Sequence, residues 1–193
     1  MLIRAVHAQK SSGMNVAMHD LRQSPILLFA IGNESRGDDA IAPLLLRRLS
    51  AWLTEESLAG NYELLEDFQL QVEHATDVFG RELVLFIDAG MDTSAPYCFY
   101  RITNDESRTL FSHAITPEAV LSTFKNIYQL NPPPAFVLCV CGEQFELGSP
   151  PSPDALKHME SAFKFLLELT KAPNDSAWDK LCIAKRRGTS QSS

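Results

Sequence analysis

The chain has 193 residues, of which 45% are hydrophobic and 21% are charged, and its formal net charge is −7. This length fits one domain, since a single core grows efficiently up to roughly 250 residues, and the composition is that of an ordered globular protein. The ends carry +2 (residues 1–24) and +3 (residues 171–193), so residues 25–170 carry −12. Because nucleic acid binding needs clustered Lys and Arg, we expect no nucleic acid partner.

The compartment is predicted from what the sequence shows at its N-terminus and from its cysteines. No apolar segment precedes a small-residue cleavage site, and no apolar run approaches the roughly 20 residues that span a bilayer. We therefore expect a soluble, cytoplasmic protein without a membrane partner, whose cysteines are reduced. Cys139 and Cys141 form a Cys-x-Cys pair, but further ligands at a matching spacing are missing. We interpret both as small apolar residues of a buried strand.

Residues 1–24 show no sustained periodicity and are predicted to be a loose extension that precedes a domain over residues 25–171. The domain opens with the run ILLFAI (26–31), which is short, continuous and apolar, as in a strand buried on both faces of a parallel sheet. Apolar residues then recur at three- and four-residue intervals from Ile41 to Leu53, which predicts an amphipathic helix.

Strands and helices alternate in the rest of the domain. Further strands are predicted at YELLEDF (62–68), ELVLFIDAG (82–90), PYCFYRI (96–102, at an edge) and AFVLCVC (135–141), and helices at 71–80, 116–130 and 152–169. The last two helices begin with Thr or Ser, then Pro, then an acid, a typical helix start. The pattern predicts a single α/β domain with a twisted, mostly parallel sheet of about five strands and helices on both faces. Residues 172–193 are polar and are predicted to be a mobile tail.

The loop GNESRGDD (32–39) joins the first strand to the first helix. Gly32 and Gly37 have the glycine spacing of a phosphate-binding loop, but Asp38 and Asp39 stand where that loop has Lys and Ser or Thr. Two adjacent anions oppose phosphate, which excludes a nucleotide-hydrolysing enzyme. One acid at a helix N-terminus is explained as a cap, whereas the second adds repulsion that a bound cation would relieve.

Other candidate side chains follow the same edge of the predicted sheet. Asp88 comes directly after the strand LVLFI, so it should lie near Asp39, because ligands collect outside the carboxyl ends of parallel strands. Among the five histidines, His113 precedes a helix start and could join this edge, whereas His158 is expected in a helix far from the strand ends. Two carboxylates and an imidazole would suit a borderline divalent metal.

Four segments, in order and spacing, resemble the [NiFe]-hydrogenase maturation endopeptidases: IGNESRGDDAIAP, VLFIDAG, SHAITPEAVL and GEQFELGSPPSP. The resemblance covers about residues 25–170 and is closest to the branch that serves soluble or bidirectional NAD(P)-linked hydrogenases. It implies an endopeptidase that removes the C-terminal extension of the hydrogenase large subunit precursor once nickel has been inserted. It also implies that the enzyme recognises this nickel in the precursor and binds no permanent metal or cofactor. We expect the enzyme itself to be a monomer.

The resemblance also implies which residues act. Asp39, Asp88 and His113 are the predicted catalytic and nickel-contacting residues, with Asp38 and Glu118 as further candidates. The third contact stays open between His113 and Glu118, because some family members place the histidine directly after a Ser-Pro pair, where this chain has Thr116, Pro117 and Glu118. The segment GEQFELG either shapes specificity for one large subunit or is a structural turn. The family loop favours glycine where this chain has Ala40 and Ala42.

Two alternatives use the same residues. A metal-dependent hydrolase of a small molecule would hold its own ion, so it predicts stoichiometric metal in the purified protein. A non-catalytic assembly factor for hydrogenase would bind a nickel-loaded partner without changing its mass, and its binding would survive Asp39→Asn.

Overall fold

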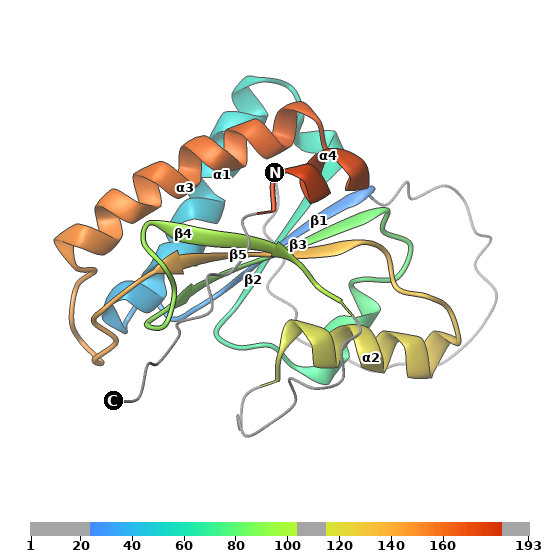
Figure 1. The fold of residues 1–193 in the computed structure, drawn as a ribbon, viewed down its shortest axis with the longest axis horizontal. Helices are drawn as coiled ribbons and strands as arrows, with labels where there is room; N and C mark the ends of the chain where they lie inside the picture. The colour runs from blue at the N-terminus through green and yellow to red at the C-terminus, as the bar shows by residue number, and fades with distance from the viewer. Residues whose placement is uncertain (1–23, 104–114, 183–193) are drawn as a thin grey trace, which may run out of the picture.

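A computed structural model of the chain describes residues 24–103 and 115–182 (Figure 1). Its strands are β1 (Ile26–Ile31), β2 (Tyr62–Asp67), β3 (Leu83–Gly90), β4 (Tyr97–Arg101) and β5 (Ala135–Cys141). Its α-helices are α1 (Ile41–Glu55), α2 (Pro117–Tyr128), α3 (Pro153–Lys171) and α4 (Asp175–Lys180). Short 3-10 helices are η1 (Gly37–Ala40), η2 (Ala59–Asn61) and η3 (Val72–Thr76).

The five described strands form one sheet in the order β2-β1-β3-β5-β4. The first three neighbouring pairs are parallel, and β4 pairs antiparallel with β5 at the edge. In the centre of the sheet, Leu28 of β1 is paired in register with Leu64 of β2 on one side and with Leu85 of β3 on the other. Leu85 is in turn paired with Phe136 of β5. The mostly parallel sheet and the edge position of β4 are as predicted, whereas the antiparallel direction of β4 was not predicted.

Helices cover both faces of the sheet (Figure 1). On one face, α1, α3 and α4 pack over a core that includes Leu45, Phe99 and Leu166. On the other face, α2 and η3 pack over a second core that includes Phe29 and Phe124. The continuous apolar strands serve both cores, because successive side chains of one strand point to opposite faces. Helices on both faces are thereby confirmed.

The predicted helix starts at Thr116 and Ser152 are confirmed. The Thr116 hydroxyl accepts a hydrogen bond from Ala119 N at 3.3 Å, and the Ser152 hydroxyl accepts one from Ala155 N at 3.2 Å. The helix predicted at 71–80 is instead a short 3-10 helix, η3, followed by turns to Gly80. Asp88 lies within β3, opposite Cys139, because the strand continues past the apolar run LVLFI over most of the predicted range 82–90.

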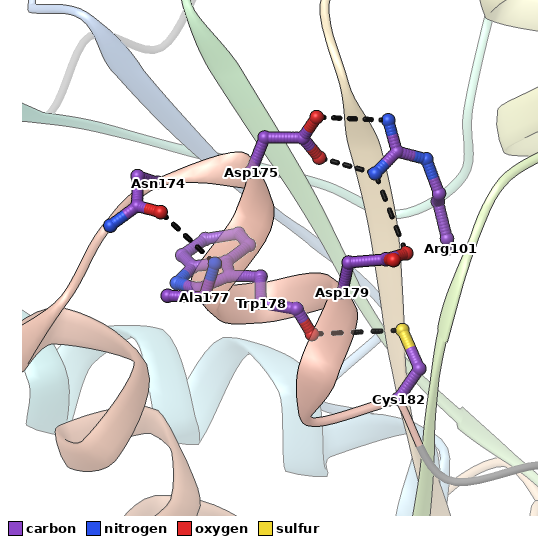
Figure 2. Close-up of polar contacts among 7 residues, drawn as sticks. All are labelled: Arg101, Asn174, Asp175, Ala177, Trp178, Asp179 and Cys182. Carbon is purple, nitrogen blue, oxygen red and sulfur yellow. Dashed lines mark hydrogen bonds and ion pairs between the residues drawn. The ribbon is translucent and has the colours of Figure 1, made fainter.

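The predicted start of a polar tail at residue 172 is too early. Helix α4 lies in this stretch, and its Trp178 is 1% exposed and donates through Nε1 to the Leu169 carbonyl at 3.1 Å. Figure 2 shows Arg101 of β4 beside Asp175 and Asp179 of α4, and Arg101 forms a two-pronged ion pair with Asp175. One large aromatic residue thus anchors a helix whose other side chains are exposed or partly exposed.

None of the helices within residues 24–103 and 115–182 has both the length and the apolar character needed to cross a membrane. All four cysteines are present as thiols. Cys139 and Cys141 lie in β5, where Cys141 is buried and Cys139 partly buried, as the interpretation of both as strand residues predicts.

Candidate functional site

The loop between β1 and η1 requires its two glycines. Gly32 has φ +154°, and a Cβ there would lie 2.0 Å from the Asp39 carbonyl oxygen. Gly37 has φ +56°, and a Cβ there would lie 2.3 Å from the Gln144 carbonyl oxygen. Side chains other than hydrogen would therefore displace backbone at both positions. The glycines allow the chain to bend back on itself and to touch the loop that follows β5.

Asp38 is a buried carboxylate that binds this second loop. Its side chain is fully buried and accepts hydrogen bonds from Glu143 N (2.7 Å), Gln144 N (2.9 Å) and Ser152 N (2.5 Å). The Ser152 hydroxyl donates a fourth, at 3.0 Å. Burial alone would raise the pKa of Asp38, but these hydrogen bonds outweigh burial and lower the pKa below its usual value. Asp38 is thus an ionised anchor for the loop 142–152.

Backbone hydrogen bonds join the same two loops along their length. Asp38 N donates to the Gln144 carbonyl at 2.7 Å, and Gly37 N donates to the Ser149 carbonyl at 2.9 Å. Gly148 N donates to the Ser35 carbonyl at 2.6 Å. We call this contact between residues 32–40 and 142–152 the loop seam. It fixes the start of α1, and with it Asp39, against the end of β5.

Asp39 and Asp88 are brought together at the carboxyl ends of β1 and β3. Both are partly exposed. Asp39 accepts a hydrogen bond from Asn33 N at 3.0 Å, and Asp88 accepts one from Ala89 N at 2.8 Å. β1 and β3 are adjacent parallel strands, so their carboxyl ends lie side by side. The expected pair of carboxylates therefore exists in the folded chain.

The pKa values of Asp39 and Asp88 are both raised, so the surroundings of these carboxyls disfavour their ionised forms. Burial raises the pKa of Asp88 to about 6, against the hydrogen bond from Ala89, and the negative charge of Asp39 adds to the increase. Burial also raises the pKa of Asp39, although Asn33 N and the Arg36 charge act in the opposite direction. Two acids that repel each other in a desolvated place are ready to accept a cation or a shared proton.

The remaining predicted residues are placed less completely. His113 lies outside the described residues. Glu118 lies in the first turn of α2, which runs antiparallel to β5, so this turn lies toward the carboxyl ends of the strands (Figure 1). Asp38 is not free to contact a metal, because both of its carboxylate oxygens accept hydrogen bonds from the loop 142–152. Within the described ranges, no group of three or more His, Cys, Asp or Glu is placed to hold a metal ion.

Two histidines of the described chain lie near strand ends, and for His158 this differs from the prediction. His158 of α3 was expected far from the strand ends, but its Nδ1 lies 2.9 Å from the carbonyl of Cys141, the last residue of β5. His74 of η3 accepts a hydrogen bond from Gln71 N at 3.0 Å and lies 3.4 Å from Asp67. The helix-period pattern in α3 identified its buried face but did not show which residue would reach the end of β5.

Two hollows of the described surface lie at the opposite end of the sheet. One, of about 360 Å³, is lined by Arg101 and by Pro134 before β5. The other, of about 310 Å³, is lined by Ile26 and Leu83 at the starts of β1 and β3. The second is also lined by Glu82 and Asp175, but Asp175 forms an ion pair with Arg101. Open α/β sheets bind their ligands at the other end, outside the carboxyl ends of the strands. The acid pair is therefore the stronger candidate site.

Several solved structures are similar to this chain in fold. The maturation protease HycI of [NiFe] hydrogenase from Thermococcus kodakarensis KOD1 superposes with a TM-score of 0.58 at 21% identity, over 78% of this chain and 95% of that one. The hydrogenase maturating endopeptidase HybD from E. coli gives 0.58 at 22%, over 76% and 93%. The chain has the fold of these maturation proteases.

A further endopeptidase of this fold, from Escherichia coli, gives a TM-score of 0.57 at 23% identity, over 78% of this chain and 94% of that one. No family model matches the sequence, and a search of curated proteins finds no match. The maturation-protease fold agrees with the single α/β domain that the sequence predicts. Because the neighbours share almost their whole length with this chain, its described core corresponds to one complete copy of the fold.

Proposed function

We propose that the protein is an endopeptidase that removes the C-terminal extension of a [NiFe]-hydrogenase large subunit after nickel insertion. The observation that carries the proposal is the pair Asp39 and Asp88 at adjacent strand ends, with the pKa of Asp88 raised to about 6. The fold is shared with proteins described as hydrogenase maturation proteases and endopeptidases, which supports the reaction type. The sequence segments that resemble the NAD(P)-linked branch suggest a soluble or bidirectional hydrogenase as the host.

In this proposal nickel belongs to the substrate. The carboxylates of Asp39 and Asp88 engage the nickel held in the precursor, with His113 or Glu118 as the third contact, and no metal or cofactor stays bound to the enzyme. Engagement of a dication relieves the repulsion between the two acids, so a loaded precursor is favoured over an empty one. Recognition of the metal then positions the C-terminal peptide near the same carboxylates, where water can attack the scissile carbonyl.

The defining experiment mixes the protein with precursor large subunit, with and without nickel, and measures product masses. We expect loss of a C-terminal peptide from the nickel-loaded precursor and none from the empty one. The purified protein should contain far less than one equivalent of metal; a full equivalent that is required for activity would instead support a metal-dependent hydrolase. An unchanged precursor mass under every loading would refute the proposal and leave a non-catalytic assembly factor.

The third contact is tested by a pair of substitutions. We expect His113→Ala to lower the rate of cleavage at least a hundredfold, as loss of a positioned acid, base or ligand does, and Glu118→Ala to lower it less than threefold. Rates are measured with the nickel-loaded precursor, and Glu56→Gln, at an exposed position beyond α1, serves as the control. The reverse order, a large loss with Glu118→Ala and none with His113→Ala, would assign the contact to Glu118.

A further inference from the structure

The most exposed large apolar side chains of the described residues gather at one end of the sheet. Leu147, Phe68 and Met91 are 76%, 71% and 67% exposed, whereas the other exposed large hydrophobics range from 40% to 56%. Phe68 directly follows β2, Met91 directly follows β3, and Leu147 lies in the loop after β5. All three therefore belong to loops at the carboxyl ends of the parallel strands, the end that carries the acid pair. We call them the apolar rim residues.

The fold holds these three side chains around the acid pair. The strand order places β1, which leads to Asp39, between β2 and β3. Gly32 N donates to the Asp67 carbonyl at 3.0 Å, which fixes the residue before Phe68 beside the first loop. Gly148, the neighbour of Leu147, is bonded to Ser35 across the loop seam. The rim residues thus border the acid pair on more than one side, on backbone that hydrogen bonds hold in place.

The charge of these loops is strongly one-sided. The four segments at this end, residues 32–40, 67–73, 88–96 and 142–152, contain nine Asp and Glu, and Arg36 is their sole Lys or Arg. Asp38 is buried and Glu34 pairs with Arg47 of α1, which leaves seven acids against Arg36. The Arg36 guanidinium lies 3.4 Å from the Phe145 carbonyl. Asp92, Glu143 and Glu146 are exposed. A partner that covers this end must therefore bring apolar groups and positive charge together.

We infer that the apolar rim residues and the surrounding acids form the docking surface for a polypeptide segment rich in apolar and basic side chains, the C-terminal segment of the precursor. The inference rests on the proposed function, which brings that segment to the acid pair. Burial of large exposed apolar side chains under a partner increases the affinity of the complex. The surrounding acids favour a basic segment over an acidic one and increase its association rate. The surface binds the segment, and Asp39 and Asp88 act on what it presents.

The test compares the kinetics of rim variants with the nickel-loaded precursor. We expect Phe68→Ser, Met91→Ser and Leu147→Ser each to raise KM about tenfold and to leave kcat within twofold, since they remove contacts made equally in the ground and transition states. Ile127→Ser is the matched control, because Ile127 is 56% exposed on α2, away from the rim. Normal KM values for all three rim variants would overturn the inference.

Charge is tested separately from apolar contact. The double substitution Glu143→Lys with Glu146→Lys should raise KM for the same precursor at least tenfold, and added salt should weaken wild-type binding more than that of the double variant. Binding of the intact nickel-loaded precursor is measured by calorimetry in parallel. A salt-independent KM together with normal binding by the double variant would contradict the basic character of the segment.

These measurements separate the surface from the reaction. Cleavage that is indifferent to the rim variants overturns the docking surface and leaves the proposed endopeptidase intact. Binding that depends on the rim without any cleavage overturns the endopeptidase and supports the surface. If the wild-type protein neither binds nor cleaves the precursor, both are wrong.

Discussion

Asp38→Asn is expected to destabilise the folded protein by about 3 kcal/mol, the cost of losing charge-assisted hydrogen bonds and leaving buried donors unpaired. An amide of the same shape presents an NH₂ group to donors where the carboxylate presented oxygen. At least one of Glu143 N, Gln144 N and Ser152 N then loses its acceptor. Urea denaturation at pH 7 measures the change, with Asp92→Asn as the control because Asp92 is exposed in a neighbouring loop.

The pH dependence of this effect has a definite sign. Because the pKa of Asp38 is lower in the folded state than in the unfolded chain, its contribution is full above the unfolded pKa of about 3.9 and is lost as the pH falls through the folded value. Ser152→Ala is a milder variant that keeps the backbone donor and should cost about 1 kcal/mol. Equal urea midpoints for Asp38→Asn and the wild type would show that the loop seam holds without its carboxylate.

Asp39→Asn and Asp88→Asn are each expected to lower the cleavage of nickel-loaded precursor at least a hundredfold, as removal of a positioned catalytic group does. Both substitutions keep size and shape but remove the charge that engages the metal. Activity is measured as kcat/KM from product masses, with Glu56→Gln as the control. Retention of full activity by either variant would remove that residue from the site.

Asp88→Asn should at the same time stabilise the metal-free protein. The folded pKa of about 6 lies above the unfolded value of about 3.9, so ionisation of Asp88 costs stability as the pH rises through this interval. The asparagine variant should match the wild type near pH 4 and exceed it by about 2 to 3 kcal/mol above pH 7. Urea midpoints from pH 4 to 8 check this, and a constant difference across that range would contradict it. Lost activity with gained stability is expected of a strained site.

Local patterns were sufficient to predict the sheet and its main helices. Continuous apolar runs indicated strands, because a strand buried on both faces is apolar at every position. A three- and four-residue period of apolar residues indicated the helix from Ile41 to Leu53, because only one face of that helix is buried. Proximity of Asp39 and Asp88 also followed, since parallel strands bring their carboxyl ends to one edge. One departure is local in origin: α4 lies in a polar stretch, and the aromatic Trp178 is its one fully buried residue, with Ala177 packed beside it against the core.

The role of Asp38 could not be predicted from its neighbours in the sequence. Its partners Glu143, Gln144 and Ser152 lie more than a hundred residues away, and three of their four contacts are made by backbone N–H groups, which leave no trace in residue type. A cap at a helix start was the local interpretation, yet the loop seam uses the carboxylate as an anchor. His158 was misplaced for a related reason, because its contact is a backbone carbonyl at the end of β5.

In the loop seam, the groups that hold the loop 142–152 in place are different from the side chains that this loop exposes to solvent. Asp38 accepts hydrogen bonds from peptide N–H groups, so the side chains of Glu143, Glu146 and Leu147 can be substituted without loss of these hydrogen bonds. A protein engineer could therefore graft new side chains at these three positions and keep Gly37, Asp38 and Ser152. Redirecting the protein to another polypeptide becomes a matter of surface substitution on a rigid frame, with folding left intact.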